Sequence, residues 1–205
     1  MLTPKIKTLV FDLGEVLIKL NFSKIMYLRR LREMHLESSL QSMNQWPLYD
    51  TFERGKITEK EFLIKLNKEL AISLTLDTFR PLWNSVLQDS VFGIEQTLKQ
   101  LAQNYPLWIL TNSNETHINH FKINYPWHNQ FQGILTSYEL GCRKPEKSIY
   151  EKLISLTHSS ANSILFVDDR KENIEGARAC GIHAELCEDT SRDLAKILKS
   201  YSIQY

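Results

Sequence analysis

Two strongly apolar runs of the sequence end in acidic side chains. TLVFD, residues 8–12, ends in Asp12, and ILFVDD, residues 164–169, ends in Asp168 and Asp169. A carboxylate at the end of a core strand must be solvated, paired or used in chemistry, because an unpaired buried charge is costly. Two such junctions in one chain point to a shared site.

Polar side chains follow two further segments. LWILTNSN contains Thr111, Asn112 and Ser113 at its end, and GCRKPE contains Lys144. Acids that crowd together raise one another's pKa unless a cation compensates, and Mg²⁺ commonly binds one or two carboxylates together with phosphate oxygens. With Lys144 as a second positive charge and hydroxyl donors nearby, the set predicts phosphoryl transfer, in which an aspartate can be the nucleophile.

The elements that would bring these residues together are those of an α/β fold. In the second half of the chain, short runs rich in Val, Ile, Leu and Phe alternate with helix-period segments, as in βαβ units with a mostly parallel sheet. Because ligands bind at the carboxyl ends of such strands, the polar residues are expected to meet there. Strands are predicted near residues 6–12, 107–111, 133–136, 163–168 and 183–187, and helices over 93–103, 146–157 and 171–180.

Residues 16–87 have a different pattern. Apolar residues recur at helical spacing around residues 25–31, 36–43 and 62–70, and the last stretch follows the capping box Thr58-Glu59-Lys60-Glu61. We therefore predict an α/β protein in which a Rossmann-like, mostly parallel sheet core carries an inserted all-helical cap. The predicted core comprises residues 1–15 and 88–205, and the predicted cap comprises residues 16–87.

The aromatic residues of this insert are expected to form its own core, although an aromatic residue that faced the crevice would explain selectivity for sugars. Trp46, Tyr49, Phe52 and Trp83 are the members of this set. Arg54, which precedes Gly55, is expected in a solvated loop.

Composition excludes several classes of function. The 205 residues include 25 Lys and Arg against 24 Asp and Glu, a net charge of +1, which gives no electrostatic footprint for nucleic acid or an anionic membrane. Three cysteines without CxxC spacing indicate neither a disulfide framework nor a structural zinc site, and no segment has the length of a signal peptide or a membrane span. A reduced, cytoplasmic location is expected, with the chain a monomer or a homodimer. His117 and His120 lack carboxylates at metal-site spacing and are taken as surface residues or neighbours of the phosphate loop.

Four motifs in this order resemble those of the haloacid dehalogenase superfamily of aspartate-nucleophile phosphohydrolases. They are FDLGEVL, LTNS, RKP, and VDD with Asn173 and the following EGARACGI. Each lies at a predicted strand end, and the resemblance covers essentially the whole chain, including a helical cap after the first motif. It implies that Asp12 is the nucleophile, that Thr111 and Asn112 bind the phosphoryl oxygens, and that Lys144 steadies nucleophile and phosphate.

The same resemblance implies a Mg²⁺ site. Asp12 and Asp168 would be direct ligands, Gly14 would contribute its backbone carbonyl, and Asp169 would be a ligand or a partner of one. Phosphatases of this family usually carry a second aspartate at the position of Gly14, and this aspartate protonates the leaving oxygen. Since general acid assistance contributes roughly 10²- to 10⁴-fold in rate, we expect a preference for leaving groups that are stable anions, such as anomeric, acyl or aryl phosphates. Glu15 is the nearby substitute acid, although acids beside a motif are often bystanders.

The leading hypothesis is a Mg²⁺-dependent phosphatase for a small phosphorylated metabolite, such as a sugar 1-phosphate, acting through an aspartyl phosphate on Asp12. A hydrolytic dehalogenase would use the same aspartate without a metal, and the acidic pair Asp168 and Asp169 argues against it. A signalling receiver domain would have its acidic pair on the first strand and would be much shorter. A catalytically weakened protein that only binds phosphorylated ligands is the remaining alternative, because of Gly14.

Overall fold

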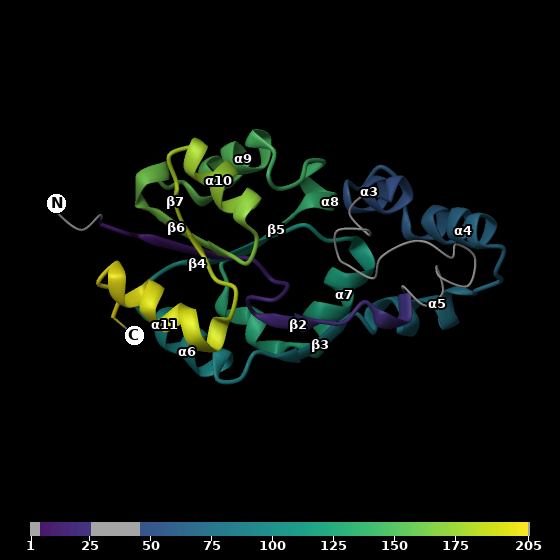
Figure 1. The fold of residues 1–205 in the computed structure, drawn as a ribbon, viewed down its shortest axis with the longest axis horizontal. Helices are drawn as coiled ribbons and strands as arrows, with labels where there is room; N and C mark the ends of the chain where they lie inside the picture. The colour runs from purple at the N-terminus through teal and green to yellow at the C-terminus, as the bar shows by residue number, and fades with distance from the viewer. Residues whose placement is uncertain (1–4, 26–45, 205) are drawn as a thin grey trace.

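A five-stranded parallel sheet forms the centre of the protein (Figure 1). The structure, a computed structural model, describes residues 5–25 and 46–204. The strand order is β5-β4-β1-β6-β7, so β1 pairs with β4 on one side and with β6 on the other. These strands are the five predicted from the sequence, and the α/β architecture is confirmed. They are β1 (Thr8–Phe11), β4 (Leu107–Thr111), β5 (Gly133–Thr136), β6 (Ile164–Asp168) and β7 (His183–Leu186).

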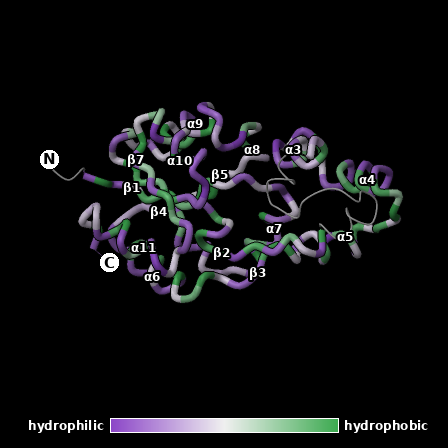
Figure 2. Tube along the Cα trace, in the orientation of Figure 1, coloured by the Kyte–Doolittle hydropathy of each residue, from purple (hydrophilic) through white to green (hydrophobic). Residues whose placement is uncertain are grey.

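Helices cover both faces of this sheet. Because side chains alternate along a strand, Leu9 and Phe11 pack on one face and Val10 on the other. The first face is covered by α6 (Ile94–Leu101), α7 (Glu115–Asn124), η1 (Pro126–Gln130) and α11 (Thr190–Ser200). The second is covered by α9 (Lys147–Thr157) and α10 (Lys171–Ala179). Figure 2 shows the resulting concentration of hydrophobic residues along the central strands, which explains their continuous apolar runs.

Two short elements complete the core, α8 (Ser137–Leu140) after β5 and η2 (Ala161–Ser163) before β6. Among the helices that the structure describes, none has the length and apolar character needed to cross a membrane.

The helices of the insert have a hydrophobic core of their own. They are α3 (Pro47–Glu53), α4 (Glu59–Leu70) and α5 (Leu76–Asn84). Phe52 and Phe62 stack with ring centroids 4.3 Å apart, and Trp46 and Trp83 are buried beside them, as expected from the sequence. The capping box of Thr58 and Glu61 is present at the start of α4. The helical patterns predicted between residues 28 and 43 lie outside the described residues.

A short antiparallel pair of strands, β2 (Ile18–Leu20) and β3 (Leu87–Ser90), lies where the chain enters and leaves this insert (Figure 1). Neither strand was predicted, because both are short and, with the sequences IKL and LQDS, lack the continuous apolar run that marks the core strands. β2 falls within the segment expected to be all-helical. The exact boundaries of core and cap stay a prediction.

Side-chain contacts join the insert to the core on two sides. Beyond the end of α3, Gly55 has a φ of +62°, and a Cβ atom there would lie 2.1 Å from the carbonyl oxygen of Tyr138. The hydroxyl of Ser137 donates to the main-chain oxygen of Glu53 at 2.7 Å. On the other side, Thr116 of α7 donates to Glu59 of α4 at 2.9 Å. The cap is therefore attached to α7 and α8, the helices that follow β4 and β5.

His117 lies buried at this junction and contacts both units. Its Nε2 is 3.1 Å from the carbonyl oxygen of Trp83 in α5, and its ring stacks on the Trp83 indole. Its Nδ1 is 3.1 Å from the side-chain amide of Asn114, so both ring nitrogens are engaged within the protein. Burial lowers the pKa of His117 to about 4, and the Trp83 carbonyl opposes this shift. His117 is thus a neutral packing residue rather than a metal ligand.

Replacing His117 with Gln is expected to change the pH dependence of stability. The ordinary histidine pKa is 6.5 and the folded one about 4, so between these values the unfolded state binds more protons. Stability contributed by the neutral ring is therefore lost as the pH falls through this window. The loss from pH 7 to pH 5 is about 2 kcal/mol, at about 1.4 kcal/mol per pKa unit.

Urea unfolding of wild type and His117→Gln at pH 7 and pH 5 measures this loss of stability. The difference between their free energies of unfolding should shrink by about that amount at the lower pH. His158→Asn, at the exposed end of α9, is the control and should parallel wild type. Parallel behaviour of His117→Gln would contradict the interpretation.

Candidate active site

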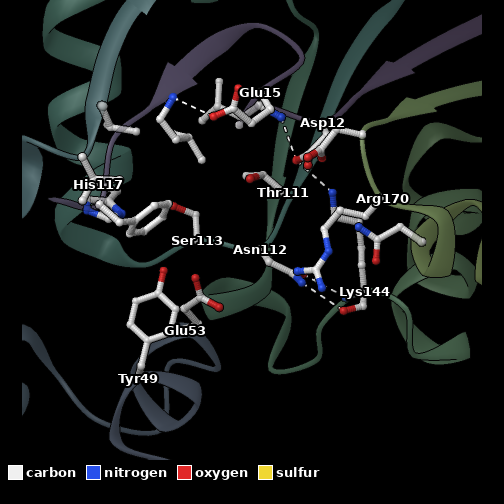
Figure 3. Close-up of a pocket in the computed structure, with 18 residues that line it drawn as sticks. Asp12, Glu15, Tyr49, Glu53, Thr111, Asn112, Ser113, His117, Lys144 and Arg170 are labelled. Carbon is white, nitrogen blue, oxygen red and sulfur yellow. Dashed lines mark hydrogen bonds and ion pairs between the residues drawn. The ribbon is translucent and has the colours of Figure 1, made fainter. Parts of the chain in front are cut away.

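The side chain of Lys144 lies between Asp12 and Asp168 at the carboxyl edge of the sheet. Figure 3 shows its contact with Asp12. Its Nζ is 2.8 Å from Asp12 Oδ1 and 2.6 Å from Asp168 Oδ2. Asp12 directly follows β1, Asp168 is the last residue of β6, and Lys144 comes from the loop between α8 and α9. All three residues are buried. Asp12 and Asp168, which are 156 positions apart in the sequence (168 − 12), therefore form one charged cluster with Lys144.

The pKa values in this cluster reflect an excess of negative charge. Burial raises the pKa of Asp12 to about 7; Lys144 opposes the rise, whereas the carboxylates Asp168 and Asp169 add to it. Burial and Asp168 raise the pKa of Asp169 to about 6. Burial disfavours the charge of Lys144, but Asp12 and Asp168 outweigh it, so the pKa of Lys144 is above its ordinary value. One ammonium group does not compensate three neighbouring carboxylates.

The donor set fits a hard divalent cation. Asp12, Asp168 and Asp169 each offer a carboxylate oxygen, and these oxygens lie within 4.8 Å of one another. Oxygen ligands and surplus negative charge are what Mg²⁺ requires. In the described residues this is the one group of three or more His, Cys, Asp or Glu side chains close enough for a metal ion. Gly14 borders the same cavity, and its carbonyl oxygen accepts a hydrogen bond from Val16 N at 2.7 Å.

Hydrogen bonds fix the orientation of Asp168. The Asn173 side chain donates to both of its oxygens, at 2.9 and 3.1 Å, and Arg170 N donates to Oδ1 at 2.8 Å. The hydroxyl of Tyr150 in turn donates to the carbonyl oxygen of Asn173 at 2.8 Å. The metal motif is therefore held rigidly before any ligand arrives.

Asn112 fixes the Lys144 loop in a similar way. Its Nδ2 donates to the carbonyl oxygen of Lys144 at 2.9 Å, and its Oδ1 accepts from Lys144 N at 2.8 Å. The sequence predicted Asn112 as a phosphoryl ligand, and the structure gives its amide this further positioning role. Thr111 is buried at the end of β4 and, like Asn112, borders the cavity beside the charged cluster.

The cluster opens into a cavity between core and cap of about 680 Å³, its open mouth included. Core loops supply its phosphate-side wall, which includes Asp12, Thr111, Ser113, Lys144, Asp169 and Arg170. The strand pair and the cap helices supply the opposite wall, which includes Leu20, Phe22, Tyr49, Glu53, Val86 and Leu87.

Leu20 of β2 occupies the space beside Gly14. A Cβ atom on Gly14 would lie 2.6 Å from Leu20 Cδ1. The carboxylate of Glu15 is also engaged, because its Oε1 accepts from Leu20 N at 3.0 Å and its Oε2 lies 3.4 Å from Lys19 Nζ. The second aspartate that the resemblance leads one to expect is therefore absent at Gly14, and Leu20 of β2 packs into the space beside it. The Glu15 carboxylate binds Leu20 and Lys19 of the same strand.

Two polar cap residues lie in the cavity wall. The cap core was favoured for Tyr49 over a position facing the crevice, and Glu53 was not named, yet the Tyr49 hydroxyl and the Glu53 carboxylate point into the cavity (Figure 3). Arg143, the residue before Lys144, holds Glu53 Oε2 at 2.7 Å. Burial raises the pKa of Glu53, and Arg143 opposes this rise. The signal in the sequence was an acidic residue one helical turn after Tyr49, within an otherwise apolar helix face.

Arg54 was expected in a solvated loop, and the structure corrects this. Its guanidinium lies 2.8 Å from Asp50 and 2.5 Å from Glu146, and its side chain is 20% exposed. Asp50 also pairs with Arg143 at 2.6 Å. Helix α3 is thus attached to the Lys144 loop by a network of ion pairs, which sequence patterns cannot show because its members are far apart in the chain.

Comparisons with known proteins find relatives that match nearly the whole chain. A D-ribitol-5-phosphate phosphatase of Bacteroides thetaiotaomicron is 24% identical over 210 residues, covering 95% of this chain and 100% of that protein. A haloacid dehalogenase family enzyme from the same organism, solved with magnesium and inorganic phosphate, superposes with a TM-score of 0.80 at 24% identity, covering 94% of this chain and 98% of that one. A predicted hydrolase of this type from Porphyromonas gingivalis gives a TM-score of 0.82 at 21% identity, covering 98% and 100%.

The structural likenesses concern the fold, and the family assignment comes from the sequence. The sequence model of the haloacid dehalogenase-like hydrolases matches residues 6–181, a range that contains Asp12, Lys144 and Asp168 together with the cap. The chain therefore belongs to the haloacid dehalogenase-like hydrolase family.

Proposed function

We propose that this protein is a Mg²⁺-dependent phosphatase that hydrolyses a small phosphorylated metabolite. The observation that carries the proposal is the buried contact of Lys144 Nζ with both Asp12 and Asp168, beside a cavity between core and cap. The similarity to a phosphatase of a sugar alcohol phosphate, and to an enzyme solved with magnesium and phosphate, supports it.

In the proposed reaction Asp12 attacks the phosphorus atom. Its Oδ1 is held by Leu13 N at 2.7 Å and by Lys144, which leaves Oδ2 for attack. The new P–O bond forms as the bond to the leaving oxygen breaks, and the electron pair departs with that oxygen. Water then attacks the phosphorus of the aspartyl phosphate, releasing inorganic phosphate and regenerating the Asp12 carboxylate.

Asp12, Asp168, Asp169 and the Gly14 carbonyl are the groups proposed to hold the metal ion. When bound, Mg²⁺ supplies positive charge for the phosphoryl oxygens and for the crowded carboxylates. Lys144 supplies the other positive charge and keeps the nucleophile oriented. Thr111 contributes a hydroxyl donor at the phosphoryl side of the cavity.

The side chain at position 14 cannot protonate the leaving oxygen. No carboxyl group is attached at Gly14, and Leu20 fills the adjacent space. We therefore infer a preference for leaving oxygens that are stable as anions, such as the anomeric oxygen of a sugar 1-phosphate. Ribitol 5-phosphate, named for the relative, has an alkyl leaving group and ranks lower on this argument.

Hydrolysis of p-nitrophenyl phosphate by the purified protein tests the reaction. We expect activity with Mg²⁺, loss of activity with excess chelator, recovery when Mg²⁺ is added back, and a decrease of about a thousandfold or more for Asp12→Asn. Asp89→Asn, an exposed isosteric change on β3, is the matched control and should retain wild-type activity. Equal activity of Asp12→Asn would contradict the proposal, as would chelator-insensitive activity on 2-haloacids, which a dehalogenase would show.

The leaving-group preference is tested with two isomeric substrates. Wild type should hydrolyse glucose 1-phosphate with a higher kcat than glucose 6-phosphate. The pair Gly14→Asp with Leu20→Ala should narrow the gap by raising turnover of the 6-phosphate, by up to about 10²-fold if the new acid is well placed. Leu20→Ala alone is the control for altered packing and should leave the ratio unchanged. Faster turnover of the 6-phosphate by wild type would overturn this preference while leaving the phosphatase reaction intact.

A further inference from the structure

The cap contributes two polar groups to the cavity that the phosphoryl chemistry does not use. Tyr49 and Glu53 lie one turn apart on α3, and both point toward the space above the phosphate side of the cavity (Figure 3). We propose that they form a subsite for the hydroxyl groups of the substrate, so that the enzyme selects sugar or sugar alcohol phosphates. This inference rests on the proposed phosphatase function.

The Glu53 carboxylate is held in place from several directions. Arg143 Nη2 lies 2.7 Å from its Oε2, and the Tyr49 hydroxyl donates a hydrogen bond to the same carboxylate. Its main-chain oxygen accepts from Ser137 Oγ, which also accepts from Ser113 N at 2.9 Å in the cavity wall. The side chain is therefore oriented before the substrate binds, which reduces the entropic cost of recognition.

The available bonding capacity of the two residues matches hydroxyl donors. A carboxylate has about four acceptor positions, and Arg143 and Tyr49 account for two of them. The Tyr49 hydroxyl donates a hydrogen bond to Glu53, and its oxygen keeps lone pairs that can accept. Every group left over is an acceptor. A sugar or sugar alcohol, which carries several O–H donors, complements such a surface, whereas a purely apolar substituent would leave buried acceptors unpaired.

The charges around Glu53 also favour a substituent that carries hydroxyl groups. Arg54 and Arg143 face the three acids Asp50, Glu53 and Glu146, so this network has one surplus negative charge. Arg170, the other cation that acts on Glu53, pairs with Glu172. Each of these three guanidinium groups thus has an acidic partner within the protein. A neutral, hydroxylated substituent is favoured over a carboxylate or a second phosphate.

The test compares one hydroxylated substrate with one that lacks hydroxyl groups on its substituent. The quantity measured is the ratio of kcat/KM for the better of glucose 1-phosphate and ribitol 5-phosphate to kcat/KM for p-nitrophenyl phosphate. Glu53→Gln should lower this ratio by about 10- to 100-fold, mainly through a higher KM for the hydroxylated substrate, because a charged acceptor is lost. Tyr49→Phe should lower it in the same direction and keeps the aromatic ring in the cap core.

Asp50→Asn is the matched control. Asp50 also pairs with Arg143, at 2.6 Å, but it does not line the cavity, so its ratio should equal that of wild type. An unchanged ratio in Glu53→Gln would overturn the subsite. If Glu53→Gln fails to fold, an unchanged ratio in Tyr49→Phe has the same meaning. Wild type that hydrolyses p-nitrophenyl phosphate but neither hydroxylated ester would also refute the inference, whereas wild type inactive on all three would refute the phosphatase proposal instead.

Discussion

The buried ammonium of Lys144 is the contact on which the rest of the site depends. It lies 2.8 Å from Asp12 and 2.6 Å from Asp168, which follow or end the adjacent strands β1 and β6. A positive charge between the two carboxylates offsets their mutual repulsion and part of the cost of burying them. The loop that carries Lys144 is in turn bound by Asn112 at the end of β4. The order of the strands in the sheet therefore determines which charged side chains meet in the site.

The sequence was sufficient to predict the core of the protein and the composition of this cluster. Parallel strands buried on both faces require continuous apolar runs, and the first polar residue after each run marks the carboxyl edge. Asp12, Thr111 and Asp168 could be assigned to that edge for this reason. Lys144 follows no strand directly, and it was found through the order of the motifs. The roles assigned to these residues stay predictions, whereas their proximity is a property of the fold.

The rest of the cavity was beyond sequence reasoning for identifiable physical reasons. Tyr49 lies on an apolar helix face and contributes both to the cap core and to the cavity wall, and periodicity does not distinguish the two positions. The partners of Arg54 and Arg143 come from α3 and from the Lys144 loop, so their pairing depends on how cap and core meet. The contact of Leu20 with Gly14 depends on a three-residue strand that leaves no pattern of its own.

The antiparallel pairing of β2 with β3 brings the two chain crossings between core and helical insert side by side. The chain thus enters and leaves the insert at one place, and all five parallel strands of the sheet lie outside the insert. The cavity residues contributed by α3 and the residues of the charged cluster are therefore encoded in separate stretches of the sequence, and the ion pairs between α3 and the Lys144 loop join them in space.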